Sequence, residues 1–247
     1  MFATIPSFMQ RYFSPHWYYA DSAWQLDADI CRKGGKWLPQ FLEDAQEFNG
    51  DQKNDLEIQK WPAALQGLKR LIEGTELRED QIAILECRLD TRQRIDAILC
   101  GRNSKDEDTA FLLELKTWFA RSNGFDLDHA EGDEKIIAHT MEGSHPILHP
   151  SVQVNQYRTR LQFLLDRDFF DTTNLRFCSA VYLHNLENMP SEWGDVLFHK
   201  KFRPHTKKSR IFCQWNEKDL FDAVAKNISH GSGLSAMQKL IHISPMK

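Results

Sequence analysis

Apolar residues recur along the chain with two different periods, and the change of period separates the predicted elements. In residues 53–73 they return at the spacing of a helix that buries one face. Pro62 is expected in the first turn of this helix or at a restart, because a proline in a helix interior removes a backbone hydrogen bond. Residues 82–89, 93–101 and 109–119 are short apolar runs bounded by polar turns, which predicts three strands.

The second half of the chain predicts further elements, separated by polar stretches. Helices are predicted at residues 152–166 and 218–228, and strands at residues 175–186 and 211–215. Residues 120–149 are expected to form a long loop or a small excursion, and residues 187–210 an irregular segment. The order helix, three strands, helix, strand predicts an α/β sandwich around a small mixed sheet.

The amino-terminal part differs in composition from the rest. Residues 1–49 are rich in Phe, Tyr and Trp, and the segment WLPQFLEDAQEF is typical of a short helix. A polar break at Asn49, Gly50 and Asp51 follows. We therefore expect an aromatic-rich helical extension over residues 1–49 and one main domain over residues 50–247.

Composition narrows the class of protein. The chain has 247 residues, which suits one large domain, and a formal net charge of −4, so a phosphate-binding surface would have to be local. Its five cysteines form no CxxC pair, which indicates reduced thiols. The start lacks the pattern of a signal peptide, and no stretch has the length of a membrane span. These features predict a cytoplasmic protein without a membrane partner.

Three charged residues stand inside the apolar strands. Asp96 lies in the second predicted strand, and Glu114 and Lys116 lie in the third. Residues i and i+2 of a strand share a face, so Glu114 and Lys116 point the same way, and Asp96 can face them from the neighbouring strand. A charge in such a place costs free energy unless it is paired or binds a metal.

Two carboxylates and one ammonium at one point suit the hydrolysis of a phosphodiester. Carboxylate oxygens bind Mg²⁺ or Mn²⁺, which polarises a phosphate and lowers the pKa of a bound water. Lys116 can orient that water or offset the charge that develops on the phosphate. The alternative is a structural ion pair between adjacent strands, a common use of Glu and Lys on sheets.

The sequence around these residues resembles the PD-(D/E)XK nuclease superfamily. A helix with Gln153 and Tyr157 one turn apart narrows the resemblance to its RecB-like branch. The segments QRID, ELKxW, HPSxQxxxY and YLHN resemble the amino-terminal nuclease domain of bacterial Schlafen-type helicase–nucleases. This resemblance covers about residues 50–240 and rests on Arg94, Asp96, Glu114, Lys116, Trp118, His149, Pro150, Ser151, Gln153, Tyr157, Tyr182, Leu183, His184 and Asn185.

The resemblance implies a restriction-endonuclease-like fold and a set of site residues. Asp96, Glu114 and the main-chain carbonyl of Leu115 would hold the metal, with Gln153 and Tyr157 facing the same site. Glu57 and Glu86 are alternative candidates for a further metal-binding acid. Ile95 stands where the superfamily often has proline. In the sequence, Pro150 and Ser151 fit the first positions and the cap of the Gln153 helix.

The resemblance also implies a biological role: a DNA nuclease in bacterial anti-phage defence or DNA repair, acting with a helicase. The chain has no Walker A sequence, so the helicase would be a separate partner or a missing domain. The alternatives are a docking subunit of a larger complex with weak catalysis, or an RNase. The oligomeric state, a homo-oligomer included, stays open. One basic run is a candidate contact for the nucleic-acid backbone: Lys200, Lys201, Arg203, Lys207, Lys208 and Arg210.

Overall fold

The computed structural model describes residues 19–22, 55–78, 80–88, 93–118, 125–141, 143–167 and 175–242; the side chains of 19–22, 55–62, 86, 88, 166, 167, 241 and 242 lie outside that description. A mixed sheet forms the centre of the protein. Its strands are β1 (Tyr19–Ser22), β2 (Ile82–Arg88), β3 (Arg94–Arg102), β4 (Asp108–Leu115), β8 (Leu175–Leu183) and β9 (Arg210–Cys213). They lie in the order β1-β2-β3-β4-β8-β9.

The direction of the strands changes across this sheet. β1 to β4 pair antiparallel, and β4, β8 and β9 pair parallel. Parallel neighbours need a crossover, and the chain makes one between β4 and β8 through the helix α5 (Pro150–Arg167). The order helix, three strands, helix, strand is confirmed, and with it the α/β class.

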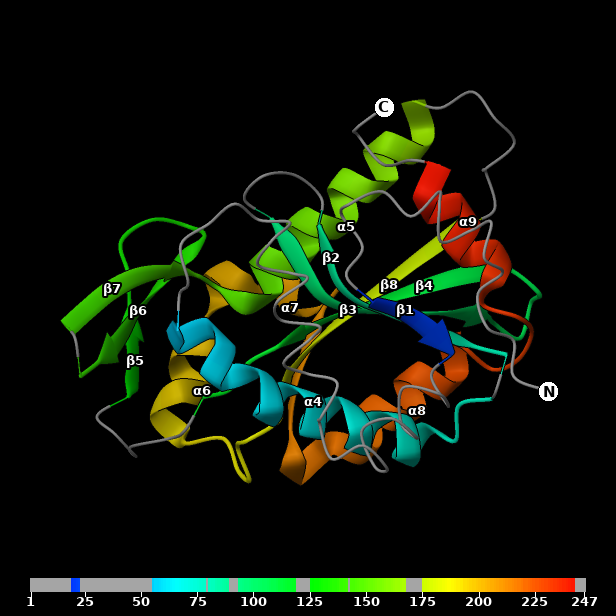
Figure 1. The fold of residues 1–247 in the computed structure, drawn as a ribbon. Helices are drawn as coiled ribbons and strands as arrows, with labels where there is room; N and C mark the ends of the chain where they lie inside the picture. The colour runs from blue at the N-terminus through cyan, green and yellow to red at the C-terminus, as the bar shows by residue number, and fades with distance from the viewer. Residues whose placement is uncertain are drawn as a thin grey trace.

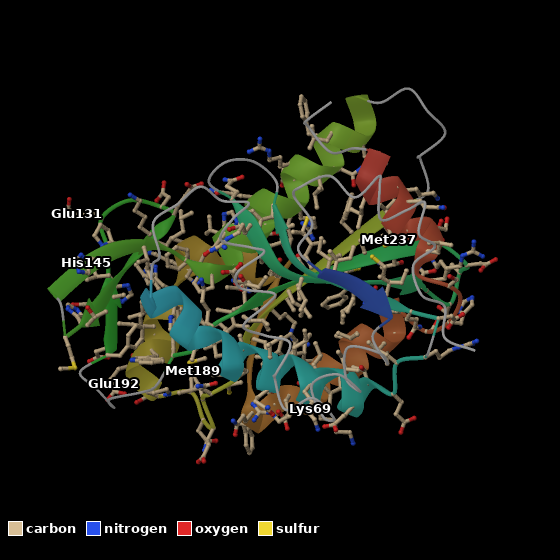
Figure 2. The ribbon with its side chains drawn as sticks, viewed as in Figure 1. Lys69, Glu131, His145, Met189, Glu192 and Met237 are labelled. Carbon is tan, nitrogen blue, oxygen red and sulfur yellow. The ribbon has the colours of Figure 1, made fainter. Side chains whose placement is uncertain are left out.

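Helices cover both faces of the sheet (Figure 1). The helices α4 (Asp55–Thr75) and α8 (Glu217–Asn227) lie on one face, and α5 and α9 (Leu234–His242) lie on the other. All residues of β4 except Leu115 are buried, because this strand lies in the middle of the sheet and is covered on both sides. On α9, Met237 is fully buried and points toward the sheet (Figure 2).

The helix α4 begins at Asp55 and runs without a break through Pro62, so Pro62 lies neither in the first turn nor at a restart, and both expectations are wrong. A proline inside a helix costs about 3 kcal/mol. The same helix buries Leu65, Leu68, Leu71 and Ile72 against the sheet. Burial of each such side chain contributes about 1.5–3 kcal/mol, so packing outweighs the local cost.

Residues 120–149 contain more structure than a loop. The strands β5 (Asp126–His129), β6 (Lys135–Thr140) and β7 (Gly143–Leu148) form a separate antiparallel sheet, so the small excursion is the closer of the two expectations. It projects from one end of the central sheet, with Glu131 and His145 at its outer edge (Figures 1 and 2).

The expectation of an irregular segment at residues 187–210 is wrong. This stretch forms the helix α6 (Ser191–Leu197), the 3₁₀ helix η2 (Lys200–Phe202) and the helix α7 (Arg203–Thr206). A periodic apolar pattern needs a window of about 11–18 residues, and these helices are too short to supply one. A 3₁₀ helix η3 (Gln214–Asn216) follows β9.

Part of the amino-terminal extension belongs to the central sheet. β1 comes from residues 1–49 and pairs antiparallel with β2 at the sheet edge, with Tyr19 opposite Leu85. The expected helix of WLPQFLEDAQEF lies outside the described residues. Cys87, Cys100, Cys178 and Cys213 are free thiols. In the described part of the chain, no helix has the length and apolar composition that a membrane crossing requires.

Candidate active site

The predicted site residues come from three elements that meet at one end of the central sheet. Asp96 lies in β3 and Glu114 in β4. These strands pair antiparallel with Ala97 opposite Leu113. One residue further along, this register places Asp96 opposite Glu114. Lys116 comes directly after β4, and its backbone N–H donates to the carbonyl of Tyr182 at 3.0 Å, which continues the pairing with β8.

The side chains of this site form a connected series of hydrogen bonds. The Lys116 Nζ lies 2.6 Å from Glu114 Oε1 and donates to Gln153 Oε1 at 3.2 Å. Gln153 Nε2 in turn donates to the Tyr157 hydroxyl at 2.8 Å, within α5. On the other strand, Asp96 Oδ2 accepts from the backbone N–H of Leu115 at 2.6 Å. The structure therefore brings together all five side chains that the sequence singled out.

Burial decides the electrostatics of the site. Glu114 is only 1% exposed, while Asp96, Lys116 and Gln153 are half-buried, so the site reaches solvent on their side. Burial and the nearby carboxylate of Asp96 raise the pKa of Glu114 to about 8, against the opposing effect of Lys116. Burial by itself lowers the pKa of Lys116, but Glu114 and Asp96 outweigh it and raise the pKa, so Lys116 stays an ammonium.

Glu114 also has an unsatisfied oxygen. Its Oε2 atom is buried, and no hydrogen-bond partner for it exists among the described residues. A buried carboxylate oxygen without a partner costs free energy that a bound cation can offset. Oxygen ligands from Glu114, Asp96 and the Leu115 carbonyl are the kind that Mg²⁺ and Mn²⁺ prefer. The donor set therefore fits a divalent cation.

The third acid of the predicted metal set lies outside what the structure describes. Glu57 is in α4 and Glu86 is in β2, and neither side chain is among the described ones. Within the side chains that are described, no group of three or more His, Cys, Asp or Glu lies close enough together to hold a metal ion. Asp96 and Glu114 are thus the described carboxylates of the site.

Two histidines of the resemblance have structural roles. His149 Nε2 lies 2.9 Å from the Leu197 carbonyl, and its Nδ1 accepts from the backbone N–H of Ser151 at 3.2 Å. The cap of α5 is therefore His149 and not Ser151, whose buried hydroxyl has no hydrogen-bond partner in the described structure. His184 Nε2 lies 3.1 Å from the Thr117 hydroxyl, next to Lys116 in the chain. Both histidines are fully buried.

The basic run divides into side chains with different surroundings. Lys200, Arg203, Lys207 and Arg210 line one cavity of about 710 Å³. Lys201 instead donates to the carbonyls of Ala130 and Gly132 at 2.9 and 2.8 Å, and ties the second sheet to η2. Lys208 is exposed and is not among the residues lining the cavity.

Two aromatic residues near this cavity carried no signal in the sequence. Phe198 lines the cavity and is 52% exposed, and Trp215, directly before the lining residue Asn216, is 77% exposed. Exposure depends on how distant segments pack, so a sequence pattern cannot reveal it.

Comparison of the chain with known protein families, with curated proteins and with solved structures found no match.

Proposed function

We propose that this protein is a metal-dependent nuclease of the PD-(D/E)XK type that hydrolyses phosphodiester bonds of DNA. The observation that carries the proposal is the buried Oε2 of Glu114, which has no hydrogen-bond partner among the described residues and belongs to a carboxylate beside Asp96 and Lys116. A simple ion pair between strands would satisfy both carboxylate oxygens or expose them to water. A carboxylate that lies beside a lysine and has one buried oxygen without a described partner is better explained as a ligand for a cation.

Asp96, Glu114 and the Leu115 carbonyl would hold Mg²⁺ or Mn²⁺, which when bound supplies Lewis acidity toward a phosphate group. Asp96 is held for this role by the N–H of Leu115, which fixes one of its two oxygens. In the same proposal, either Glu57 or Glu86 supplies a further ligand to the metal.

Lys116 contributes a fixed positive charge. Its ammonium is held between Glu114 Oε1 and Gln153 Oε1, at 2.6 and 3.2 Å. A positive charge that is already in place can stabilise the negative charge that develops on a phosphate oxygen without reorganisation. In this proposal Lys116 also orients the attacking water.

Gln153 and Tyr157 act as positioning residues. Because Gln153 Nε2 donates to the Tyr157 hydroxyl, its Oε1 is left to accept from Lys116. Burial and the charge of Glu114 raise the pKa of Tyr157, so its hydroxyl stays protonated and can donate to a substrate oxygen.

The proposal is tested by cleavage of single-stranded DNA, duplex DNA and RNA of matched sequence in Mg²⁺, Mn²⁺ or EDTA. The variant Asp96→Asn keeps an oxygen that accepts from the Leu115 N–H but loses the charge. We expect wild-type protein to cut DNA only with metal, and Asp96→Asn to cut it slower by about a hundredfold or more. Asp133→Asn, an exposed acid on the second sheet, is the matched control and should cleave normally.

Normal cleavage by Asp96→Asn, or cleavage in EDTA, would contradict the proposal. Cleavage of RNA in place of DNA would keep the chemistry and change the substrate. The helicase partner and the role in anti-phage defence or DNA repair remain part of the proposal, and they rest on the resemblance of the motifs.

A further inference from the structure

The cavity lined by the basic run is an isolated positive site on an acidic protein. Among the described residues its lining is Phe198, Lys200, Arg203, Thr206, Lys207, Arg210, Ile211 and Asn216, with no acidic side chain. The whole chain carries a net charge of −4. The volume of the cavity, about 710 Å³, is that of a site for a small organic ligand or a short piece of a polymer.

Three of the four cations of this cavity have no carboxylate partner among the described residues. Within the described structure, no carboxylate forms an ion pair with Lys200, Arg203 or Lys207. Arg210 lies 3.5 Å from Asp219 and over the ring of Phe212, and both members of that ion pair are more than half exposed. An ordinary solvated surface mixes charges of both signs, so four cations that line one cavity, three of them without a carboxylate partner among the described residues, indicate an anionic ligand.

One exposed aromatic side chain lines the cavity, and a second is the chain neighbour of a lining residue. The described residues contain four exposed large hydrophobic side chains: Met141, Phe163, Phe198 and Trp215. Two of them, Phe198 and Trp215, belong to this cavity or directly precede a residue that lines it. Cations together with flat apolar rings match a ligand that alternates phosphates and bases.

The cavity is fixed to the helix of the candidate active site. The helix α7, which carries Arg203, packs against α5, and Asn155 Nδ2 donates to the His205 carbonyl at 3.0 Å. The last residue of α6 is tied to the start of α5 by the contact of Leu197 with His149. A strand that enters the cavity would therefore be held at a constant position relative to Gln153.

We propose that this cavity binds a single-stranded tract of DNA, with Lys200, Arg203, Lys207 and Arg210 on its phosphates and Phe198 and Trp215 stacked on its bases. Stacking on both rings requires unpaired bases, which a duplex does not offer. This inference rests on the proposed nuclease function for the choice of DNA, and it adds that the substrate is held as a single strand.

The test measures binding of a fluorescent oligo-dT of about ten nucleotides to the whole chain in EDTA, where cleavage plays no part. The test variant replaces Lys200, Arg203 and Lys207 by Gln. The matched control replaces Lys105, Lys218 and Lys226 by Gln, which removes the same charge from exposed positions outside the cavity and outside the basic run. We expect the cavity variant to bind at least about tenfold weaker, and the slope of log affinity against log salt to fall by about two.

A separate pair of variants tests the stacking of bases on the aromatic side chains. Trp215→Ala should weaken binding roughly tenfold, whereas Phe163→Ala, which removes an exposed ring on α5, should leave it unchanged. Equal losses in the two triple variants would overturn the cavity assignment. Duplex of the same length that binds as tightly as the single strand would overturn the single-strand assignment. Circular dichroism and the melting temperature of each variant show that it is folded.

The two proposals fail separately. If the cavity variant loses binding but wild-type protein never cuts DNA with metal, the inference about the cavity stands and the proposed nuclease function falls. If wild-type protein cuts DNA and the cavity variant binds oligo-dT like its control, the nuclease function stands and the inference falls.

Discussion

At the residue scale, the question is why a charged side chain occupies a buried strand position. Glu114 is 1% exposed, and Lys116 Nζ lies 2.6 Å from one of its oxygens, while the other oxygen has no hydrogen-bond partner among the described residues. Breaking a buried ion pair costs about 3–5 kcal/mol, so the pair is stable once formed, but an apolar pair would be cheaper. The retention of charge is therefore explained by function more readily than by stability.

A bound metal should stabilise this residue pair measurably, even without substrate. Mg²⁺ or Mn²⁺ at about a hundred times its Kd stabilises a protein by about 2.7 kcal/mol. For a chain of this size we expect a rise in Tm of about 5–10 °C. Differential scanning fluorimetry of wild-type protein with and without metal checks this.

The variants Asp96→Asn and Glu114→Gln should lose that rise in Tm, because each removes one of the two described carboxylates. Glu131→Gln and Asp133→Asn change exposed acids of the second sheet and should keep it. A wild-type protein whose Tm does not respond to either metal would contradict the metal site, whatever its activity.

The sequence could single out Asp96, Glu114 and Lys116 because a charge in an apolar run is visible without a structure. It could also place Gln153 and Tyr157 on one helix face, since that is a matter of spacing. It could not choose between Glu57 and Glu86, because the choice depends on how α4 and β2 approach the site.

At the scale of the elements, the start of α5 shows how a local rule can be overridden. Pro150 and Ser151 are favoured residues for the start of a helix, and the sequence predicted a serine cap. The structure uses the imidazole of His149, because its Nε2 also reaches the Leu197 carbonyl of α6. One ring thus caps α5 and holds α6 beside it.

This use of His149 makes stability depend on pH. Its Nδ1 accepts a hydrogen bond, so the ring must stay neutral, and burial lowers the pKa of His149 from its usual 6.5 to about 4. The unfolded chain binds a proton between these values and the folded protein does not. The free energy of unfolding therefore falls as the pH drops from 6.5 toward 4, by on the order of 3 kcal/mol for this residue.

Urea unfolding at about pH 7.5, 6 and 5 measures this slope. His149→Asn keeps an acceptor for the Ser151 N–H but has no group that titrates there, so it should be less stable at neutral pH and should lose part of the slope. The rest of this pH dependence is expected from His184, because burial lowers the pKa of His184 to about 4 as well. An unchanged slope in His149→Asn would contradict the role given to this ring.

At the scale of the whole molecule, a buried carboxylate ties the carboxy-terminal helix to the far end of the sheet. Asp108, at the start of β4, is 6% exposed. Its oxygens accept from Arg102 Nε at 2.9 Å, Lys239 Nζ at 2.7 Å and the Ser235 hydroxyl at 2.5 Å. Burial raises the pKa of Asp108, but these donors outweigh it and lower the pKa, so the group stays charged.

Asp108→Ala should lower the free energy of unfolding by about 2–3 kcal/mol, because it removes the buried carboxylate that Lys239 and Arg102 share and leaves Arg102 with the exposed Asp106. Asp106→Asn is the matched control, since Asp106 pairs with the same Arg102 at 3.2 Å but is 68% exposed, and asparagine also adopts its left-handed backbone (φ 64°), so the change should cost under about 0.5 kcal/mol. Denaturant unfolding at neutral pH measures both. Equal costs would contradict the importance of burial in this network.

By itself, the sequence determined the order of the main elements, the α/β class and the group of charges in the central strands. These follow from local properties: the period of apolar residues and the cost of a charge inside an apolar run. Only the tertiary structure decided that one buried oxygen of Glu114 has no hydrogen-bond partner among the described residues, that His149 caps α5, and that part of the basic run lines a cavity with Phe198. Each of these depends on contacts between segments far apart in the chain, which no local pattern encodes.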